Sequence, residues 1–337
     1  MKEVLDFVNF DFHLPVTDPT WIFFLVLVII LFAPIVLERL RIPHIIGMIL
    51  AGVVIGEHGF NILARDSSFE LIGKMGLYYI MFLAGLEMNM EDFKSIRVKA
   101  TVLGLLAFIF PLGIGIWTNL HLLGYSLATS VLLASMYASH TLIAYPIVIR
   151  YGINRQRAVS IAVGGTAVTD TLTLLVLAVV GGMYKGETSE MFWIWLVLKV
   201  VVLSVVIMYA FPRIGRWFFR RYSDNVVQYI FVMAKVFLGA GLMEFVGMEG
   251  ILGAFLAGLV LNRLIPHVSP LMSHLEFVGN ALFIPYFLIG VGMLIDVNVL
   301  FGHIDSVKVA VVMIIVALLG KWIASWLTQK IYNMRAL

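Results

Sequence analysis

Asp170 is a lone carboxylate in the middle of an apolar stretch, residues 156–182, with Thr169 beside it. An ionised side chain at the centre of a bilayer costs at least about 2.5 kcal/mol, so a carboxylate at that depth indicates a functional site. Residues three and four apart share a helix face, so Thr166 and Thr173 lie on the same face as Asp170. A membrane threonine often donates to a carbonyl of its own helix, and we expect this of Thr173.

A second polar cluster lies in the preceding apolar stretch, residues 125–150, where Ser139 and Thr141 stand near the centre. Pro146 follows them and, because proline has no N–H, it leaves the carbonyl of Leu142 without its helical partner. A broken helix at membrane depth is tolerated where it lines a cavity or a site buried in protein. The sequence therefore predicts a helix break whose free carbonyl and hydroxyls face a cation.

Oxygen atoms alone make up the predicted site. They are the carboxylate of Asp170, the hydroxyl of Thr169, and the hydroxyls or carbonyls of Ser139 and Thr141. Such hard ligands suit Na⁺, K⁺ or a hydrated proton rather than a soft metal. His140 has no second His or Cys at a zinc-binding spacing, so we interpret it as a packing or hydrogen-bonding residue.

The composition is that of a polytopic helical membrane protein: 337 residues, 61% hydrophobic and 13% charged, with a mean hydropathy of +1.02. The chain has no cysteine, which excludes disulfides and thiolate chemistry. No nucleophile–base pair or metal cluster stands out, so an enzyme is disfavoured and no cofactor is expected. A hydrocarbon core of about 30 Å takes roughly 20 apolar residues per helix. We expect eleven spans, at residues 20–38, 43–56, 70–90, 97–121, 125–150, 156–182, 190–212, 224–247, 249–265, 276–297 and 305–332.

Basic residues mark one side of the membrane. The loops after even-numbered spans hold little more than Arg65 and Lys185. The loops after odd-numbered spans hold Arg39, Arg41, Lys94, Arg97, Lys99, Arg150, Arg155, Arg157, Arg213, Arg216, Arg220, Arg221, Arg263, Lys330 and Arg335. The positive-inside rule therefore predicts that the N-terminus is outside and that the C-terminal end of this chain is in the cytoplasm. We expect the membrane to be the plasma (bacterial inner) membrane.

Two sequence motifs occur twice, once in each half of the chain. Span two contains IGMILAGVVIG from Ile46 and span nine contains LGAFLAGLVLN from Leu252. Span three contains FLAGLEMNMED from Phe82 and span ten contains FLIGVGMLID from Phe287. Spans two and nine run in opposite directions, and an inverted repeat of this kind is typical of transporters. The small residues in both copies are also compatible with close helix packing alone.

The repeat predicts one transmembrane domain over residues 1–337. Its first repeat covers about 20–182, a linker helix lies at 190–212, and the second repeat covers 224–332. The second repeat is incomplete, because the counterparts of spans five and six would be spans twelve and thirteen. We therefore expect this chain to be a C-terminally truncated segment of a longer protein. Pro285 also predicts a kink in span ten.

These motifs resemble a known family. SHTLIAYPIV from Ser139, GGTAVTD from Gly164, PHIIGMILAGVVIGEHG from Pro43 and IPYFLIGVGMLID from Ile284 resemble the monovalent cation:proton antiporter 2 family, the NapA/Kef-type transporters. The resemblance extends over almost the entire chain. It implies a NapA/NhaA-like inverted-repeat antiporter fold of thirteen helices, of which about eleven are present, with a broken helix in a mobile core domain. It also implies a dimerisation domain and a homodimer that works by alternating access.

The resemblance further implies that Asp170 carries either a proton or the cation, never both. Family members often have Asp, Asn or Gln before this aspartate, whereas this chain has Thr169. With one carboxylate in the pair, the resemblance favours electroneutral exchange of one cation for one proton. Na⁺ is favoured and K⁺ is the alternative, because both take oxygen ligands. The expected partners are these ions, the lipid bilayer and a second copy of the chain, and no nucleic acid.

Two further charges lie in or near spans. Lys235, within span eight, is either a counter-ion for Asp170 or, as we favour, a structural residue. Glu87, near the end of span three, is either a vestibule acid that gathers cations or a solvated end residue.

Two other functions stay open from the sequence. A Kef-type K⁺ efflux system, gated by glutathione and a nucleotide-binding domain, would need a glycine-rich dinucleotide-binding motif after the last span. A non-transporting membrane sensor on the same fold would signal normally after replacement of Asp170.

Overall fold

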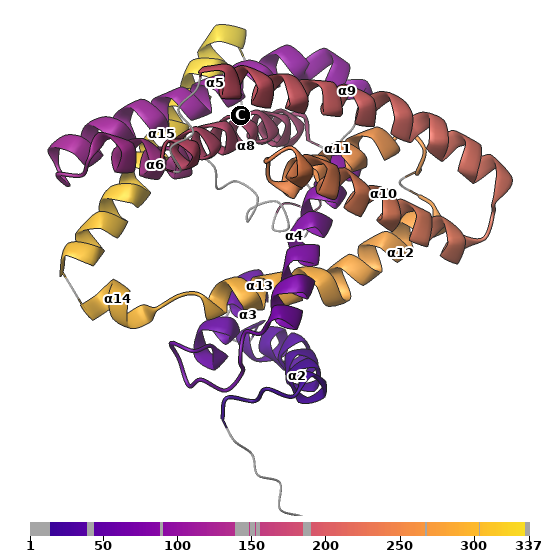
Figure 1. The fold of residues 1–337 in the computed structure, drawn as a ribbon, viewed down its shortest axis with the longest axis horizontal. Coiled ribbons are helices and arrows are strands. Elements are labelled where there is room, and N and C mark those ends of the chain that lie inside the picture. The colour runs from indigo at the N-terminus through magenta and orange to yellow at the C-terminus, as the bar shows by residue number, and fades with distance from the viewer. Residues whose placement is uncertain are drawn as a thin grey trace, which may run out of the picture. The chain divides into compact units, whose positions relative to one another are not determined.

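The computed structural model describes residues 14–38, 44–87, 90–138, 148, 152, 156–184, 190–266, 268–302 and 304–333. Within these ranges the secondary structure is helical, which confirms the all-α prediction (Figure 1). The elements are α2 (Pro19–Glu38), α3 (His44–Ile55), α4 (Ser67–Glu87), α5 (Met90–His121), α6 (Leu127–Ala138), α8 (Arg157–Tyr184), α9 (Glu190–Arg221), α10 (Asn225–Phe245), α11 (Gly250–Leu261), α12 (Pro270–Val278), the π-helical turn η3 (Gly279–Phe283), α13 (Ile284–Met293), α14 (Val297–Gly302) and α15 (Ile304–Tyr332).

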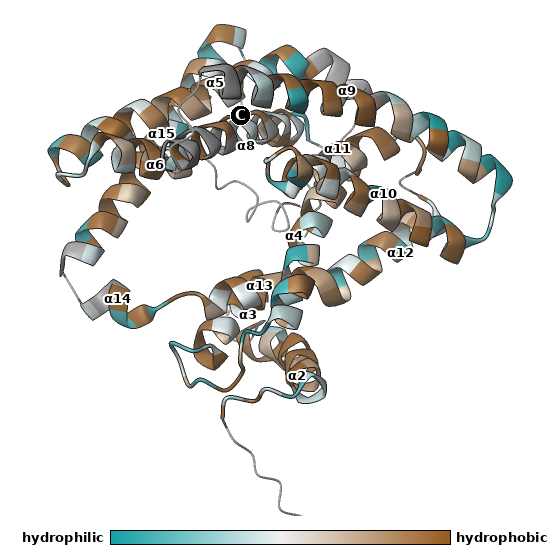
Figure 2. Cartoon of the chain, viewed as in Figure 1, coloured by the Kyte–Doolittle hydropathy of each residue, from teal (hydrophilic) through white to brown (hydrophobic). Residues whose placement is uncertain are grey.

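Eight helices in the described ranges are long and apolar enough to cross a membrane, counting α12, η3 and α13 as one. Each coincides with a predicted span, and Figure 2 shows the hydrophobic colour along them. The other three predicted spans coincide with α3, α6 and α11, which are apolar but have 12 residues each. Twelve residues cover about 18 Å, less than a hydrocarbon core of about 30 Å. The total of eleven spans therefore stays a prediction.

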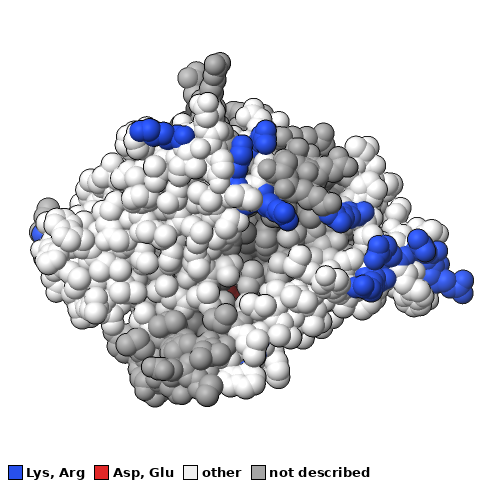
Figure 3. Space-filling model, turned by 90° about the horizontal axis from the view of Figure 1, so that it is seen from above, with Lys and Arg blue, Asp and Glu red and all other residues white. Residues whose placement is uncertain are grey.

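Helix α9 continues beyond its predicted end at residue 212 and ends at Arg221. Pro212 lies inside it. The extension is stabilised by α10, because the ring of Phe218 stacks on that of Phe231 with centroids 3.9 Å apart and planes 6° apart. Arginines in the last turn also interact favourably with the helix dipole. Figure 3 shows a cluster of basic side chains at its right. The exposed arginines near the end of α9 are Arg213, Arg216, Arg220 and Arg221.

The chain divides into two compact units, and the first comprises residues 1–77 and 280–303. In this unit α3 packs against α2 and α13. A Cβ atom on Gly52 of α3 would overlap the carbonyl oxygen of Ile289 on α13. A Cβ atom on Gly292 of α13 would likewise overlap the carbonyl oxygen of Ile49 on α3. The two helices therefore touch backbone to backbone, an approach that small residues permit.

The second unit comprises residues 78–279 and 304–337. In one part of it α5 packs against α6, α8 and α15, and in another α10 packs against α9, α11 and α12. The second half of α4 crosses α11 through glycines. A Cβ atom on Gly258 would overlap the carbonyl oxygen of Phe82, and one on Gly85 would stand 2.5 Å from the carbonyl oxygen of Phe255.

The two glycine crossings are equivalent under the sequence repeat. Span two crosses span ten in the first unit, and span nine crosses span three in the second. Gly52 and Gly258 hold the same place in the motif that the two copies share. In these contacts Gly85 and Gly292 hold equivalent positions, whereas an alignment of the two motifs from Phe82 and Phe287 would make Gly85 equivalent to Gly290. The backbone contacts therefore define the register between the two motifs more closely than the sequence does.

The turn η3 precedes Pro285, where the sequence predicts a kink. Proline cannot donate to the carbonyl four residues back and its ring crowds that carbonyl. A π-helical turn widens the helix at this point, which is one of the recognised ways in which a helix departs from regular geometry.

Candidate functional site

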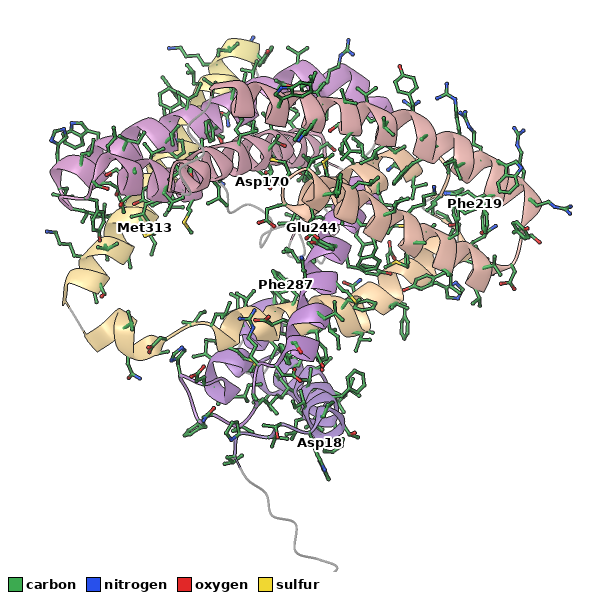
Figure 4. The ribbon with its side chains drawn as sticks, viewed as in Figure 1. Asp18, Asp170, Phe219, Glu244, Phe287 and Met313 are labelled. Carbon is green, nitrogen blue, oxygen red and sulfur yellow. The ribbon has the colours of Figure 1, made fainter. Side chains whose placement is uncertain are left out.

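Helix α8 carries Asp170 at its middle, and the helix buries the polar face predicted from the sequence. Asp170 is 8% exposed and Thr169 is 2% exposed. Glycines bring α5 close to this helix: a Cβ atom on Gly104 would stand 2.6 Å from the carbonyl oxygen of Gly165. The close approach of α5 helps to exclude solvent from the Asp170 turn. Asp170 is labelled on α8 in Figure 4.

Two threonines of this face bond within their own helix. The hydroxyl of Thr166 donates to the carbonyl of Ala162 at 2.9 Å. The hydroxyl of Thr169 donates to the carbonyl of Thr166 at 2.8 Å. This bonding satisfies the hydroxyl protons and leaves oxygen lone pairs that can accept a further interaction. Thr169 can therefore still contribute an oxygen ligand beside Asp170.

Thr173 departs from the expectation that it bonds back to its own helix. Its hydroxyl donates instead to the carbonyl of Ser135 in α6, at 3.2 Å. Ser135 belongs to the last described turn of α6. A carbonyl oxygen has two lone pairs, so it can accept a hydrogen bond from a neighbouring helix in addition to one within its own helix. Thr173 therefore ties the end of α6 to α8, one turn from Asp170.

A buried hydrogen-bond network holds α6 against α5. The hydroxyl of Tyr137 donates to Oδ1 of Asn119 at 2.7 Å, and Nδ2 of Asn119 donates to the carbonyl of Ser130 at 3.2 Å. Helix α6 ends at Ala138, well inside the apolar stretch at 125–150. These bonds and the Thr173 bond hold the last described turn of α6 against α5 and α8. The predicted ligands and break residues that follow lie outside the described residues: Ser139, His140, Thr141, Leu142 and Pro146.

Lys321 is a basic residue of the described part whose charge interacts with that of Asp170. It lies on α15, which packs against α5 and α6. Gly320 next to it allows the close packing, because a Cβ atom there would stand 2.6 Å from the Pro111 ring. Sequence reasoning missed Lys321, although the same criterion that found Asp170 applies, since it is a charge inside an apolar stretch.

Lys235 and Glu87, the other charges weighed from the sequence, have different surroundings. Lys235 is 9% exposed, and its ammonium lies 4.8 Å from the ring centroid of Phe211 and 5.5 Å from that of Phe231. Aromatic faces attract a cation, so these rings stabilise the buried charge. Glu87 is the last residue of α4, and its side chain lies outside the described part. A counter-ion role for Lys235 and a vestibule role for Glu87 stay predictions.

Among the described residues of the second unit, Asp170, Thr169 and Thr173 share one face of α8. Thr173 joins this face to the last described turn of α6, and the charge of Lys321 interacts with that of Asp170. Oxygen ligands with a single negative charge can bind a monovalent cation or a proton. An ammonium can neutralise the same carboxylate when neither is bound.

Comparison with known proteins identifies the family of the chain. The family model "Sodium/hydrogen exchanger, transmembrane" matches residues 27–336. The chain is 39% identical over 316 residues to the Na(+)/H(+) antiporter NhaS5 of Synechocystis, covering 93% of this chain and 45% of that protein. It is 29% identical over 316 residues to "Probable Na(+)/H(+) antiporter 3" of Methanocaldococcus jannaschii, covering 92% of this chain and 80% of that protein. The chain thus spans about half the length of the Synechocystis relative.

A solved structure shares the fold. The sodium proton antiporter MjNhaP1 from Methanocaldococcus jannaschii superposes with a TM-score of 0.64, covering 90% of this chain and 76% of that one at 15% identity. Identity this low supports the fold alone. Because the family model extends over nearly the whole sequence, the chain is an integral membrane protein that belongs to the sodium/hydrogen exchanger family of cation:proton antiporters.

Proposed function

We propose that the protein exchanges a monovalent cation, Na⁺ in preference to K⁺, for H⁺ across the membrane, and that Asp170 binds one or the other. The observation that carries the proposal is the burial of Asp170 at the middle of α8, beside Thr169 and in electrostatic contact with Lys321. The names of the similar proteins, which are Na⁺/H⁺ antiporters, support the choice of Na⁺.

The bound cation would take its ligands from three sources. Asp170 supplies the charge, and Thr169 supplies a hydroxyl oxygen whose proton is already donated to Thr166. The last described turn of α6, tied to α8 through Thr173, is proposed to supply main-chain carbonyl oxygens. Ser139 and Thr141 are proposed to complete the set. All of these are hard oxygen ligands, which suit an alkali cation.

Competition for one carboxylate couples the two ions. A proton and a monovalent cation each neutralise the charge of Asp170, so the two loaded forms of the site, with Lys321 in it, carry the same net charge. When the site is empty, the ammonium of Lys321 compensates the carboxylate, and an arriving cation has to displace that ammonium. Alternating access then carries the loaded site from one side to the other. With Thr169 in place of a second carboxylate, we propose that one cation exchanges for one proton without net charge transfer.

The assembly and orientation proposed from the sequence accompany this function. The protein is proposed to work as a homodimer in the plasma membrane with its N-terminus outside. The exposed arginines of the α9 end support a cytoplasmic location for that turn, because basic residues concentrate on the cytoplasmic side.

Proton flux in proteoliposomes containing the full-length protein tests the proposal. An internal pH-sensitive dye is followed after pulses of Na⁺ or K⁺, with the membrane potential either clamped at zero or left free. We expect Na⁺-driven proton movement whose rate is the same in both conditions. Asp170→Asn should abolish it, whereas Glu276→Gln, which removes an exposed carboxylate from α12, should leave it unchanged. Cation-driven proton flux that persists in Asp170→Asn would contradict the assignment.

A further inference from the structure

A groove lies between the first half of α4 and α13, and all of its lining residues belong to the first unit. Its volume is about 320 Å³. The apolar side chains that line it come from both helices and from the residue after α13: Phe69, Leu77, Phe287, Val291 and Leu294. The charged side chains that line it come from the α4 side: Arg65, Glu70 and Lys74. Phe287, labelled in Figure 4, lies on the α13 side.

The crossing of the two helices creates this groove. At one end they touch, because a Cβ atom on Gly76 would overlap the carbonyl oxygen of Phe283. Two turns earlier in α4, the ring of Phe69 separates them, and a Cβ atom on Gly290 would stand 3.0 Å from that ring. The helices therefore run in opposite directions from a closed end at Gly76. Between these contacts space is left, since a Cβ atom on Gly73 meets nothing within 4 Å.

The charges gather toward the other end of the groove. Arg65 precedes α4, and its Nη1 lies 3.5 Å from Oε1 of Glu70 in the first turn. Lys74 follows one turn later on the same helix face. The candidate span of α4 begins at Ser67, and the candidate span of α12 and α13 ends at Met293. The charged end therefore coincides with the ends of two helices that are long and apolar enough to cross a membrane.

The lining defines the chemistry of a ligand that would fit. Arg65, Glu70 and Lys74 carry two positive charges and one negative, a net charge of +1. Arginine and lysine are the side chains that bind phosphate, and a lysine stem can follow an apolar surface while its ammonium reaches water. The apolar wall would gain nothing from a small inorganic anion, and a plain hydrocarbon would leave the charges uncompensated. The ligand therefore combines a phosphate with a hydrocarbon chain.

We propose that this groove binds one phospholipid with a single net negative charge. Its phosphate interacts with Arg65 and Lys74, and one acyl chain lies along Val291, Phe287 and Leu77 toward the closed end. Phospholipids surround every integral membrane protein, so the ligand is at hand. A lipid seated here contacts α4 and α13 together, so it stabilises their crossing by mass action. The inference is independent of the ion exchange proposed above.

Lipid binding to the full-length protein tests the proposal. The protein is freed of lipid in a neutral detergent and titrated with phosphatidylglycerol or with phosphatidylcholine of the same acyl chains. Native mass spectrometry counts the bound lipid, and thermal unfolding measures its effect. We expect one phosphatidylglycerol to bind and to raise the melting temperature. Phosphatidylcholine has the same phosphate but no net charge, so it should bind on the order of fivefold more weakly.

Two variants address the two parts of the groove. Lys74→Gln should weaken phosphatidylglycerol binding on the order of fivefold and remove the preference over phosphatidylcholine. Lys199→Gln removes an exposed ammonium from α9, outside the groove, and is the matched control. Gly73→Phe places a ring in the open space, so it should weaken the binding of both lipids while the lipid-free protein melts as before. Gly73→Ala, which adds only a methyl group there, should keep both affinities.

Four outcomes would overturn the inference. Equal binding of the two lipids by the parent would exclude recognition of the charge, and an equal loss in Lys199→Gln would show diffuse surface charge. Unchanged lipid binding in Gly73→Phe would place the lipid elsewhere. A lower melting temperature of lipid-free Gly73→Phe, with Gly73→Ala unaffected, would show that the protein itself fills the groove. Because binding is measured without transport, none of these outcomes bears on the proposed exchange at Asp170.

Discussion

At the α3–α13 and α4–α11 crossings, glycines bring helices together through close main-chain contacts, whereas around Asp170 buried hydroxyls and charges also join the helices. At the crossings, Gly52 and Gly258 bring one backbone against the carbonyl of another. Around Asp170, Thr173 reaches across to α6, and Lys321 interacts with the carboxylate from α15. A glycine contact has no side chain that could change its partner, whereas a hydroxyl, a carboxylate and an ammonium can each change theirs.

The glycine crossings support the fold, whereas the polar groups around Asp170 can take part in ion binding. Close packing of small residues makes helix contacts that have one arrangement, because neither backbone can yield without breaking its own hydrogen bonds. A carboxylate that can choose between an ammonium, a cation and a proton has several arrangements of similar free energy, which a transport cycle requires. Substitutions at the two kinds of place should therefore fail in different ways, and each prediction below compares them.

Asp170→Asn should give the largest functional effect. We expect complete loss of cation-driven proton flux, because the amide carries no negative charge to attract a cation and no proton to exchange. Sodium should also cease to stabilise the fold. In the parent protein, Na⁺ at ten times its Kd should stabilise by about 1.4 kcal/mol. Thermal unfolding in detergent, with and without Na⁺, measures this. A Na⁺-dependent rise in melting temperature that survives in the variant would place the cation elsewhere.

Gly258→Ala and Gly52→Ala should instead damage the fold. Each added Cβ would overlap a carbonyl oxygen, of Phe82 or Ile289, and forcing extra atoms into a packed contact typically costs about 1–3 kcal/mol. The melting temperature and the monodispersity in detergent should both fall. Gly241→Ala and Gly73→Ala are matched helical controls, because a Cβ atom at either meets nothing within 4 Å. Equal melting temperatures for the crossing variants and their controls would show that the crossings are loose.

The site itself was predictable only where a local rule applies. Asp170 could be identified from the sequence because a charge in an apolar stretch is costly. Recognising that cost does not require knowledge of the residues around it. The back-bonded hydroxyls of Thr166 and Thr169 follow from helix geometry in the same way. The helices at most predicted spans follow from apolar length alone.

The partners of these residues could not be predicted, because they come from segments far away in the chain. Lys235 and Lys321 both lie in apolar stretches, and the sequence alone does not indicate which of them interacts with Asp170. The bond from Thr173 to Ser135 needs the end of α6 to lie beside α8. The two motifs showed small residues that are compatible with close packing, but the helices that these residues join became apparent only from the fold.

Lys321→Gln removes the positive charge that interacts with Asp170. The glutamine cannot compete with Na⁺ for Asp170, so Na⁺ should bind about fivefold more tightly, a difference of about 1 kcal/mol. Isothermal titration or the Na⁺ dependence of the melting temperature measures it. Lys308→Gln, which removes an exposed ammonium from the same helix, is the control. Weaker Na⁺ binding in Lys321→Gln would mean that the ammonium supports the bound state instead of the empty one.

Thr173→Val should give the smallest effect and the most local one. Valine has nearly the same shape but cannot donate to the carbonyl of Ser135, and the loss of one such hydrogen bond costs about 0.5–1.5 kcal/mol. Because the bond ties the carbonyl end of α6 to α8, the KM for Na⁺ should rise a few-fold while the fold persists. Thr166→Val is the matched control on the same face, since that hydroxyl donates only within α8 and its loss should be nearly neutral. If both variants shift KM equally, the effect belongs to α8 itself, and the end of α6 does not help to bind the cation. If only Thr173→Val raises the KM, one hydrogen bond between α6 and α8 contributes to cation binding. The glycine crossings differ in this respect, because they depend on close packing of the main chain.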